Sequence, residues 1–582
     1  MSGDPGSLDV ITLEILRSSL VALTEEMGLA MHRTAHSPIF NEGRDYSCAL
    51  FDGRGEMVAQ AAFDPLHLGA MPFAVEWAVA ELGLGNLRPG DVILTNDPYR
   101  GGSHLPDFTM MAPVFAGDRM VAICANRAHQ VDVGGSVPGS FFGEATEVFQ
   151  EGICVPPVLM YRGGRPVEDT WRLILSNVRD QESTRGDMQA MYGSLKIGER
   201  RVLELVERHG ADVFVRGIED IKAYSERRMR KEIEAIPDGV YQFVNWLEDD
   251  GRSREPLAVA VSVTIDGDEA IVDFSGSSPQ SRGPINAPYA VTASNVYCPF
   301  LQVVSPDIPT NHGCYRPITV LAPPGTVVNP RFPAPVVGGN VETSARINES
   351  VLGALAQAVP DRVIAPSHGS FLNLTGGGVD PRDGRDFVFY LYREGGWGGR
   401  RGTDGNSALF GTWSNDRQSS MEVNEQAYPL VFEAHAITEN SAGAGQARGG
   451  FGTTMRIRVC SPVLRLSLIA ERCRSAPFGL FGGRSPEPFA NGLWNQLRFV
   501  LADGREGHAG ELFGRVSPSK WGDIELHEGD VVEYVTTGGG GYGDVALRDP
   551  ERTRADLVLG YIDPEHAARI YHHAGVEDGV PG

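Results

Sequence analysis

Histidine and aspartate side chains recur in two neighbouring stretches in the first quarter of the sequence. His104 and Asp107 stand in one stretch, and His129 and Asp132 stand in the other. Two glycines before His104 and a proline before Asp107 disfavour a regular helix, so a loop can aim both side chains at one point. Two imidazoles with carboxylates suit a divalent metal with an open position, such as zinc, manganese or iron(II). The alternative is that these side chains only cap turns through local hydrogen bonds.

Asp45 and His67 are two further candidates in the same part of the chain. Asp45 begins a predicted strand and could be another metal ligand, although an ion pair with Arg44 or a strand cap is the alternative. His67 lies in an Asp-Pro-Leu-His-Leu-Gly segment before a predicted helix. It could act as a base or as a cap, and we favour the cap.

Two short apolar strands are predicted to position the histidine and aspartate loops. The runs Asp91–Thr95 and Met120–Ala125 are rich in β-branched residues and are bounded by turn residues. The polar segments 96–109 and 126–143 follow them. If the two strands are neighbours, as sequential strands usually are, the candidate side chains converge at their C-terminal ends.

The remaining periodic segments predict helices in the first part of the chain and strands in the later parts. A helix begins after Gly6 and ends near His36, because apolar residues recur at steps of three and four and Ser37-Pro38 disfavours continuation. Other predicted helices are 73–82, 182–208, 219–234 and 564–573, and predicted strands include 46–51, 454–459, 464–469, 496–501 and 531–535. Residues 239–274 alternate with a period of two, which indicates an antiparallel sheet.

These elements predict an α+β, or mixed α/β, fold in a large multi-layered body. We expect an N-terminal α/β region with the metal site at residues 1–235 and a mixed α/β region rich in glycine and proline at 236–450. A β-rich C-terminal region with a terminal helix is expected at 451–582. The chain of 582 residues carries 71 glycines and 38 prolines, which favours many tight turns and long structured loops.

The charge balance excludes several classes of partner. Lys and Arg number 51 against 75 Asp and Glu, for a net charge of −24, so neither nucleic acid nor a membrane surface is expected as a partner. The four lysines are preceded by Leu195, Ile221, Arg230 and Ser519. Since no lysine follows a glycine, the chain contains no phosphate-binding P-loop. ATP, if it is used, must be bound by other machinery or by a partner.

Cysteine usage and the N-terminal residues indicate a reducing cytoplasm. The seven cysteines are scattered and include no Cys-x-x-Cys pair, so neither a disulfide framework nor a zinc ribbon is expected. The first residues have no basic and apolar leader pattern, and no run of 18 apolar residues follows.

Several longer motifs, in order along nearly the whole chain, resemble the hydantoinase B/oxoprolinase family. They are Arg44–Asp52, Asn96–Asp107, Ala128–Gly135, Phe149–Gly152, Asp273–Gly276, Gly338–Thr343, Gly540–Gly543 and Arg548–Pro550. The resemblance implies a metal-containing subunit that works with a larger, actin-like subunit of the hydantoinase A type, which binds ATP. Together such pairs open cyclic amides such as hydantoins, 5-oxoproline or lactams, and a related branch carboxylates ketones.

The resemblance also implies roles for individual residues. The positions that hold the metal in the family align with Asp45, His104, Asp107 and His129, and zinc or manganese is the expected ion. Asp132 could orient His129 or act as a base, while His67 and Glu151 are weaker catalytic candidates. Because the ligand imidazoles must be neutral, activity should fall as the pH drops through the histidine range.

Three functions are therefore compatible with the sequence. The first is the metal-containing subunit of an ATP-dependent cyclic amide hydrolase. The second is a subunit of an ATP-dependent ketone carboxylase of the acetone or acetophenone type. The third is a non-catalytic subunit that only completes its partner. A chain length typical of stand-alone B subunits favours the first.

Overall fold

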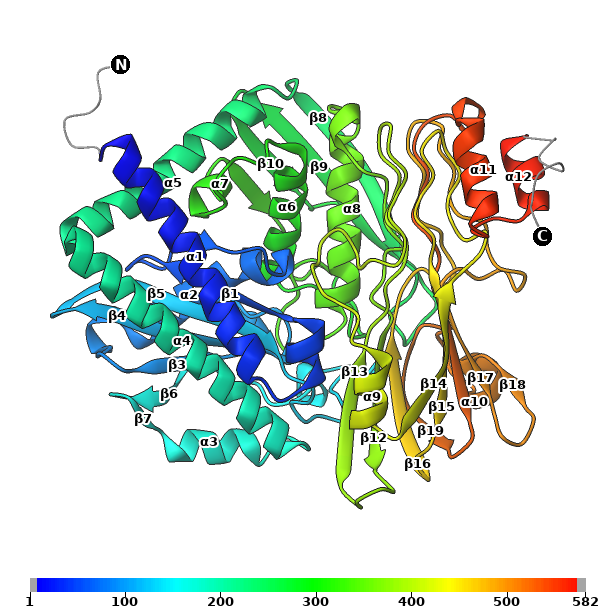
Figure 1. The fold of residues 1–582 in the computed structure, drawn as a ribbon, viewed down its shortest axis with the longest axis horizontal. Helices are drawn as coiled ribbons and strands as arrows, with labels where there is room; N and C mark the ends of the chain where they lie inside the picture. Colours follow the sequence, from blue (N-terminus) through cyan, green and yellow to red (C-terminus); the bar gives the residue numbers. More distant parts are fainter. Residues whose placement is uncertain (1–7, 573–582) are drawn as a thin grey trace.

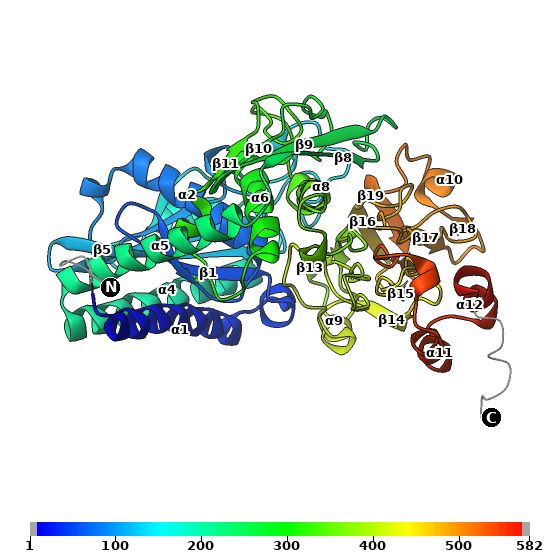
Figure 2. The same cartoon turned by 90° about the horizontal axis from the view of Figure 1, so that it is seen from above.

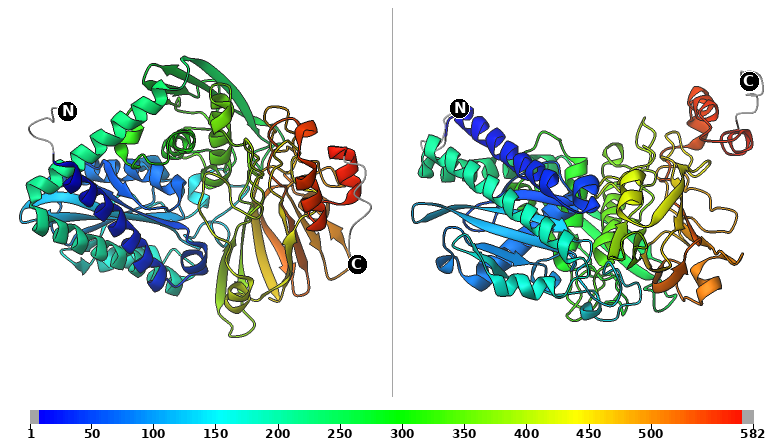
Figure 3. Two further views of the ribbon diagram at one scale, coloured as in Figure 1. Left: turned by 45° about the horizontal axis from the view of Figure 1, so that its top comes forward. Right: turned by 60° about the horizontal axis from the view of Figure 1, so that its bottom comes forward.

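A computed structural model of the chain describes residues 8–572. It has four β-sheets with helices packed on and between them, which confirms the mixed α and β class. The N-terminal, middle and C-terminal parts follow one another across the long axis of the molecule (Figure 1). The first described helix, in blue, and the last helices, in red, lie at opposite ends of this body (Figure 3).

The N-terminal sheet has seven strands in the order β2-β1-β5-β4-β3-β6-β7, and all neighbours are antiparallel. The strands are β1 (Tyr46–Phe51), β2 (Met57–Gln60), β3 (Val92–Thr95), β4 (Asp107–Ala116), β5 (Arg119–His129), β6 (Val158–Arg162) and β7 (Arg165–Pro166). Cys48 and Leu50 of β1 belong to one hydrophobic core, and Ala49 and Phe51 belong to another. Because both faces are covered, β1 is apolar without alternation, as a strand buried on both sides should be.

Helices cover both faces of this sheet (Figure 2). On one face lie α1 (Val10–Thr34) and α4 (Gln181–His209), with α5 (Ala211–Glu234) beside them, and on the other face lies α2 (Pro65–Leu82). The predicted stripe of α1 is buried at Leu16, Leu20, Leu23 and Met27. The carboxylate of Asp9 caps this helix by accepting the backbone N–H groups of residues 11 and 12.

The middle of the chain forms a four-stranded sheet in the order β11-β10-β9-β8. Its strands are β8 (Gly239–Leu247), β9 (Leu257–Asp266), β10 (Glu269–Asp273) and β11 (Ile318–Leu321), and only the β10–β11 pair is parallel. Val259, Val261 and Val263 of β9 point into the core shared with α6 (Tyr289–Val303) and α8 (Ser344–Leu355). Helix α8 stands between this sheet and the C-terminal strands (Figure 1).

Two facing sheets make up the C-terminal part. One has the order β13-β12-β16-β19 and the other β14-β15-β20-β17-β18. Their strands are β12 (Asn373–Val379), β13 (Asp386–Leu391), β14 (Leu430–Ile437), β15 (Thr453–Val459), β16 (Val463–Ile469), β17 (Gln496–Val500), β18 (Glu506–Gly507), β19 (Lys520–His527) and β20 (Val531–Val535). Trp521 and Phe499, both fully buried, share the core between the sheets. The boundary expected at residue 450 therefore does not separate two sheets, since each sheet joins strands from both sides of it.

Shorter helices complete the fold. They are α3 (Glu168–Leu175), α7 (His312–Tyr315), α9 (Met421–Ala427), α10 (Ala509–Phe513), α11 (Pro550–Val558) and α12 (Pro564–Tyr571). The last of them matches the predicted terminal helix. Within residues 8–572, no helix is both long and apolar enough to span a membrane.

Two elements near the candidate site differ from the sequence prediction. Strand β4 begins at Asp107, inside the segment predicted as loop. The sequence does not reveal this strand because it is buried on both faces and shows no alternating pattern. Helix α2 begins at Pro65 rather than at Phe73, because Asp64 caps it through the N–H of Leu66 and a proline fits its first turn. His67 therefore lies inside the first turn of α2. Asp64, and not His67, is the residue that caps the helix.

Candidate metal centre

Three adjacent antiparallel strands bring the predicted ligands together. Asp45 immediately precedes β1, Asp107 begins β4, and His129 ends β5. Asp107 and His129 are paired directly across the β4–β5 ladder, and the N–H of His129 donates to the carbonyl of Asp45 at 3.1 Å. His104, Asp107 and His129 lie close together, as predicted, but not because β3 and β5 are neighbours. Strand β4 lies between β3 and β5, and the beginning of β4 lies beside the end of β5.

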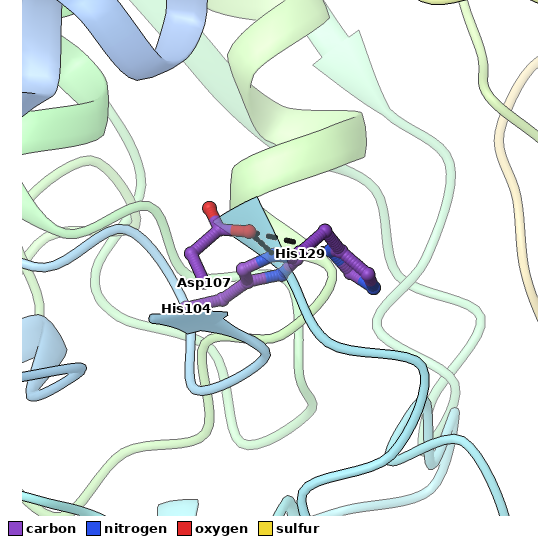
Figure 4. A group of neighbouring side chains, drawn as sticks. All are labelled: His104, Asp107 and His129. Carbon is purple, nitrogen blue, oxygen red and sulfur yellow. Dashed lines mark ion pairs between the residues drawn. The ribbon is translucent and has the colours of Figure 1, made fainter. Parts of the chain in front are cut away.

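His104 reaches the same point from the loop before β4. The N–H of Asp107 donates to the carbonyl of His104 at 3.1 Å, which closes a tight turn. In Figure 4 the carboxylate of Asp107 points toward the rings of His104 and His129. Asp107 Oδ1 lies 2.9 Å from His104 Nε2 and 3.3 Å from His129 Nδ1, and Asp45 Oδ2 lies 3.8 Å from His129 Nδ1.

These side chains suit a metal site because they are buried and because donor atoms of His104 and Asp107 make no hydrogen bond within residues 8–572. His104 and Asp107 are fully buried, His129 is 2% exposed, and Asp45 is 7% exposed. Although His104 Nε2 and Asp107 Oδ1 are close, neither atom makes a hydrogen bond to any group in the described part of the chain. A buried polar atom without a partner is costly, and a divalent cation between the two atoms would satisfy both. The donor set of imidazole nitrogens and carboxylate oxygens suits zinc, manganese or iron(II).

His67 and Asp64 stand beside these four residues. His67 Nε2 lies 3.6 Å from Asp45 Oδ1 and 3.3 Å from Asp107 Oδ2. One donor atom each from Asp45, Asp64 and His67 lies within 4.8 Å of the other two, and all three residues are buried. The sequence alone does not single out Asp64 within the segment around His67. The Asp-Pro pair that signals a helix start was the available clue to its position.

Burial and neighbouring charge shift the protonation of the cluster in opposite directions. Burial raises the pKa of Asp45 and of Asp64, and the nearby Asp416 raises both further. Burial also opposes ionisation of Asp107, but His104 and His67 lower its pKa well below the usual range. A buried guanidinium, that of Arg127, acts on Asp107 and Asp64, and burial lowers its pKa to about 10. Carboxylates therefore outnumber cationic side chains here, as expected of a site that holds a metal cation.

The pH at which metal is released follows from His129. Burial lowers the pKa of His129 to about 4, so its imidazole is neutral and able to bind metal well below the ordinary histidine range. Since protons and metal compete for the same nitrogen, we expect bound metal to be retained to about pH 5.5 and lost as the pH approaches about 4. Dialysis at stepped pH followed by metal analysis measures this. Half-release near pH 6.5, the value of an unperturbed histidine, would contradict it.

Further side chains hold the centre in place. Ser103 Oγ donates to Asp107 Oδ2, and Asn340 Nδ2 approaches the same oxygen at 3.4 Å. His104 Nδ1 lies 3.2 Å from the carbonyl of Val337. The ring of Tyr390 stacks on that of His129, with centroids 4.6 Å apart. No sequence signal marks Tyr390, whereas Asn340 lies in the Gly-Gly-Asn-Val-Glu-Thr motif.

Two other predicted site residues lie outside the cluster. The carboxylate of Asp132 accepts the N–H groups of residues 134, 139 and 179 and pairs with the Arg179 guanidinium at 2.8 Å. The carboxylate of Glu151 accepts the N–H groups of Val336 and Val337, and burial raises its pKa to about 8. Among residues 8–572, no hydrogen bond or ion pair joins either carboxylate to His129. Their catalytic roles remain predictions, while Glu151 braces the segment whose carbonyl faces His104.

Residues 9–545 match the family described as hydantoinase B/oxoprolinase. The chain belongs to this family. Among its members, an uncharacterised protein from Methanocaldococcus jannaschii is 36% identical over 566 residues, covering 97% of this chain and 96% of that one. The caprolactamase subunit beta of Pseudomonas jessenii is 32% identical over 577 residues, covering 97% of this chain and 96% of that one.

Solved structures agree with this family membership. The crystal structure of ATP-dependent caprolactamase from Pseudomonas jessenii superposes with a TM-score of 0.88 at 30% identity, covering 99% of this chain and 98% of that one. The nucleotide-free structure of acetone carboxylase superposes with a TM-score of 0.85, covering 96% of this chain and 79% of that one. At 19% identity the second likeness shows a shared fold alone.

Proposed function

We propose that this chain is the metal-containing catalytic subunit of an ATP-dependent cyclic amide hydrolase. The observation that carries the proposal is the buried cluster of Asp45, His104, Asp107 and His129, in which His104 Nε2 and Asp107 Oδ1 make no hydrogen bond to any group of residues 8–572. The similarity to a caprolactamase subunit supports an amide ring as the substrate class. Hydantoin, 5-oxoproline and lactam rings are the candidates.

The absence of a P-loop from the sequence indicates that a partner subunit binds ATP. Since no lysine follows a glycine, the chain has no P-loop of its own. We infer that a hydantoinase A-type subunit binds ATP and transfers its terminal phosphoryl group to the amide oxygen, releasing ADP and making the ring carbon electrophilic. The activated ring then reaches the buried centre of this chain. Water attacks the ring carbon there, the ring C–N bond breaks to give an amine and an acyl phosphate, and a second water releases phosphate and leaves a carboxylate.

The residues of the chain prepare the centre for this reaction. His104 and His129 would hold the metal as neutral imidazoles, and Asp107 and Asp45 would hold it as carboxylates. A zinc or manganese ion bound there would supply a Lewis acid and lower the pKa of a bound water. Tyr390 and Phe141 stack at 5.0 Å beside His129 and exclude bulk water from that side, which strengthens electrostatic interactions inside the site. Asn340 and Ser103 hold Asp107, so its carboxylate cannot turn away.

Ketone carboxylation is the second candidate, because the fold is shared with acetone carboxylase. The test combines this chain with an A-type subunit, ATP and either a cyclic amide or a ketone, with and without bicarbonate. We expect a ring-opened amide and ADP, formed without any requirement for bicarbonate. Bicarbonate-dependent consumption of ketone without amide opening would favour the carboxylase. If neither substrate reacts while metal is bound, a non-catalytic subunit is favoured.

A further inference from the structure

We propose a second divalent-cation site next to the first, formed by His67, Asp64, Asp45 and Asp107. In this arrangement Asp45 and Asp107 bridge two cations. The inference rests on the metal centre of the proposed function, and it concerns how many ions that centre holds and which residues bind the second.

The two oxygens of each bridging carboxylate face different histidines. Asp107 directs Oδ1 toward His104 and His129, at 2.9 and 3.3 Å, and Oδ2 toward His67, at 3.3 Å. Asp45 directs Oδ2 toward His129, at 3.8 Å, and Oδ1 toward His67, at 3.6 Å. A carboxylate that binds one ion needs only one of its oxygens, so this repeated split points to an ion on each side.

The burial of the Asp45 carboxylate and its lack of hydrogen bonds within residues 8–572 distinguish this site from an ordinary acidic cluster. It is only 7% exposed, yet its carboxylate accepts no hydrogen bond from any group in the described part of the chain. Its contacts are the two imidazole nitrogens, which bind a cation when neutral. Among residues 8–572 no arginine or lysine pairs with it, so a bound cation is the partner that would keep this buried carboxylate ionised.

Asp64 supplies a donor that belongs to the second site alone. It is 4% exposed, and its Oδ1 accepts the N–H of Leu66 at 2.9 Å as the cap of α2. One oxygen of Asp64 lies within 4.8 Å of donor atoms of both Asp45 and His67. Helix α2 therefore presents Asp64 and His67 toward the carboxylates of Asp45 and Asp107.

The charge of the cluster also favours two ions. Asp45, Asp64, Asp107 and Asp416 are four carboxylates that act on one another, and the buried guanidinium of Arg127 acts on Asp64 and Asp107. With neutral imidazoles, one divalent cation still leaves a net negative charge in a buried site. A second cation leaves a positive charge, which suits an anionic ligand. Two adjacent cations can clamp the oxygens of a phosphoryl group during its departure, so a phosphorylated amide is the class of substrate that this centre fits.

Ser103 and Asn340 provide the remaining contacts of Asp107 Oδ2. Hydrogen bonds of this kind are usual for metal-binding carboxylates and keep them oriented. The competing possibility is that His67 Nε2–H simply donates a hydrogen bond to Asp107. In that case one ion suffices, and Asp64 serves only as a helix cap.

Metal stoichiometry separates the two possibilities. The wild-type chain is stripped with chelator, loaded with Mn²⁺ and assayed by equilibrium dialysis with metal analysis. Crystals of the loaded chain are measured for anomalous scattering. We expect about two equivalents and two anomalous peaks about 3.5–4 Å apart. Saturation at one equivalent with one peak would overturn the second site and leave the proposed function intact. Absence of any bound ion would overturn both.

Asp64→Asn isolates the second site, because asparagine keeps the capping oxygen and removes the charge. We expect this variant to bind about one equivalent, half the wild-type amount, and to lose one anomalous peak. Asp549→Asn is the matched control, because Asp549 also caps a helix that begins with proline and accepts an N–H two residues later, at 3.0 Å. It should bind as much Mn²⁺ as the wild type. Undiminished binding by Asp64→Asn would overturn the assignment of Asp64.

Discussion

Replacing His104 with alanine is expected to abolish metal binding at the first site and to lower ATP-coupled ring opening by at least about 100-fold. Loss of a residue that merely orients a ligand already costs about 10- to 100-fold, and His104 is a proposed ligand itself. His104 is fully buried, and its Nε2 has no hydrogen-bond partner among residues 8–572. Metal analysis of the purified variant and turnover with the partner subunit measure the two effects.

His527→Ala is the control for that variant. His527 lies at the end of β19 with a side chain that is 60% exposed, and its only ion-pair partner among the described residues is Glu525. Its removal should leave both metal content and turnover at the wild-type level. Full metal retention by His104→Ala would show that His104 is not a ligand.

Replacing Lys520 with methionine is expected to destabilise the chain by about 3–5 kcal/mol. The Lys520 side chain is fully buried, and its Nζ lies 2.7 Å from Glu471 and 3.5 Å from Asp249, both of which are also buried. Methionine fills a similar volume, so most of the loss arises from leaving the buried carboxylate of Glu471 without its ion pair, whereas Asp249 keeps Arg474 at 2.9 Å. The Lys520 ion pairs join the loop after β8 and the segment after β16 to the start of β19. The midpoint of urea-induced unfolding, followed by far-UV circular dichroism, measures the change.

The same substitution at an exposed lysine provides the comparison. Lys196 pairs with Glu199 on the surface of α4, where its side chain is 41% exposed. Because exposed pairs contribute about 0–1 kcal/mol, Lys196→Met should leave the unfolding midpoint nearly unchanged. Equal midpoints for the two variants would mean that the buried cluster does not stabilise the fold.

Local sequence signals point to most residues of the buried cluster. Glycine and proline next to His104 and Asp107 marked a loop that could aim polar side chains, and His129 followed a clear apolar run. These signals depend only on residues that are close in sequence, so they can be recognised from residue type and spacing. The long helices α1 and α4 were predicted within a few residues for the same reason, because an apolar stripe needs only a 3.6-residue period.

Features that depend on distant parts of the chain could not be predicted in this way. Strand β4 is buried on both faces, so its sequence has no alternation that would distinguish it from a loop. Tyr390 of β13 stacks on His129, although the two residues are more than 250 positions apart in the sequence. No local sequence pattern predicts such a contact. His67 was assigned as a cap because its helix was predicted to begin eight residues too late.

We propose that a metal held in this buried cluster is required for opening an activated amide ring. The direct measurement is ring opening by the chain combined with its A-type partner and ATP, before and after removal of metal with a chelator. We predict that removal abolishes product formation and that added Zn²⁺ or Mn²⁺ restores it. Ring opening at an undiminished rate by the metal-free complex would contradict the claim.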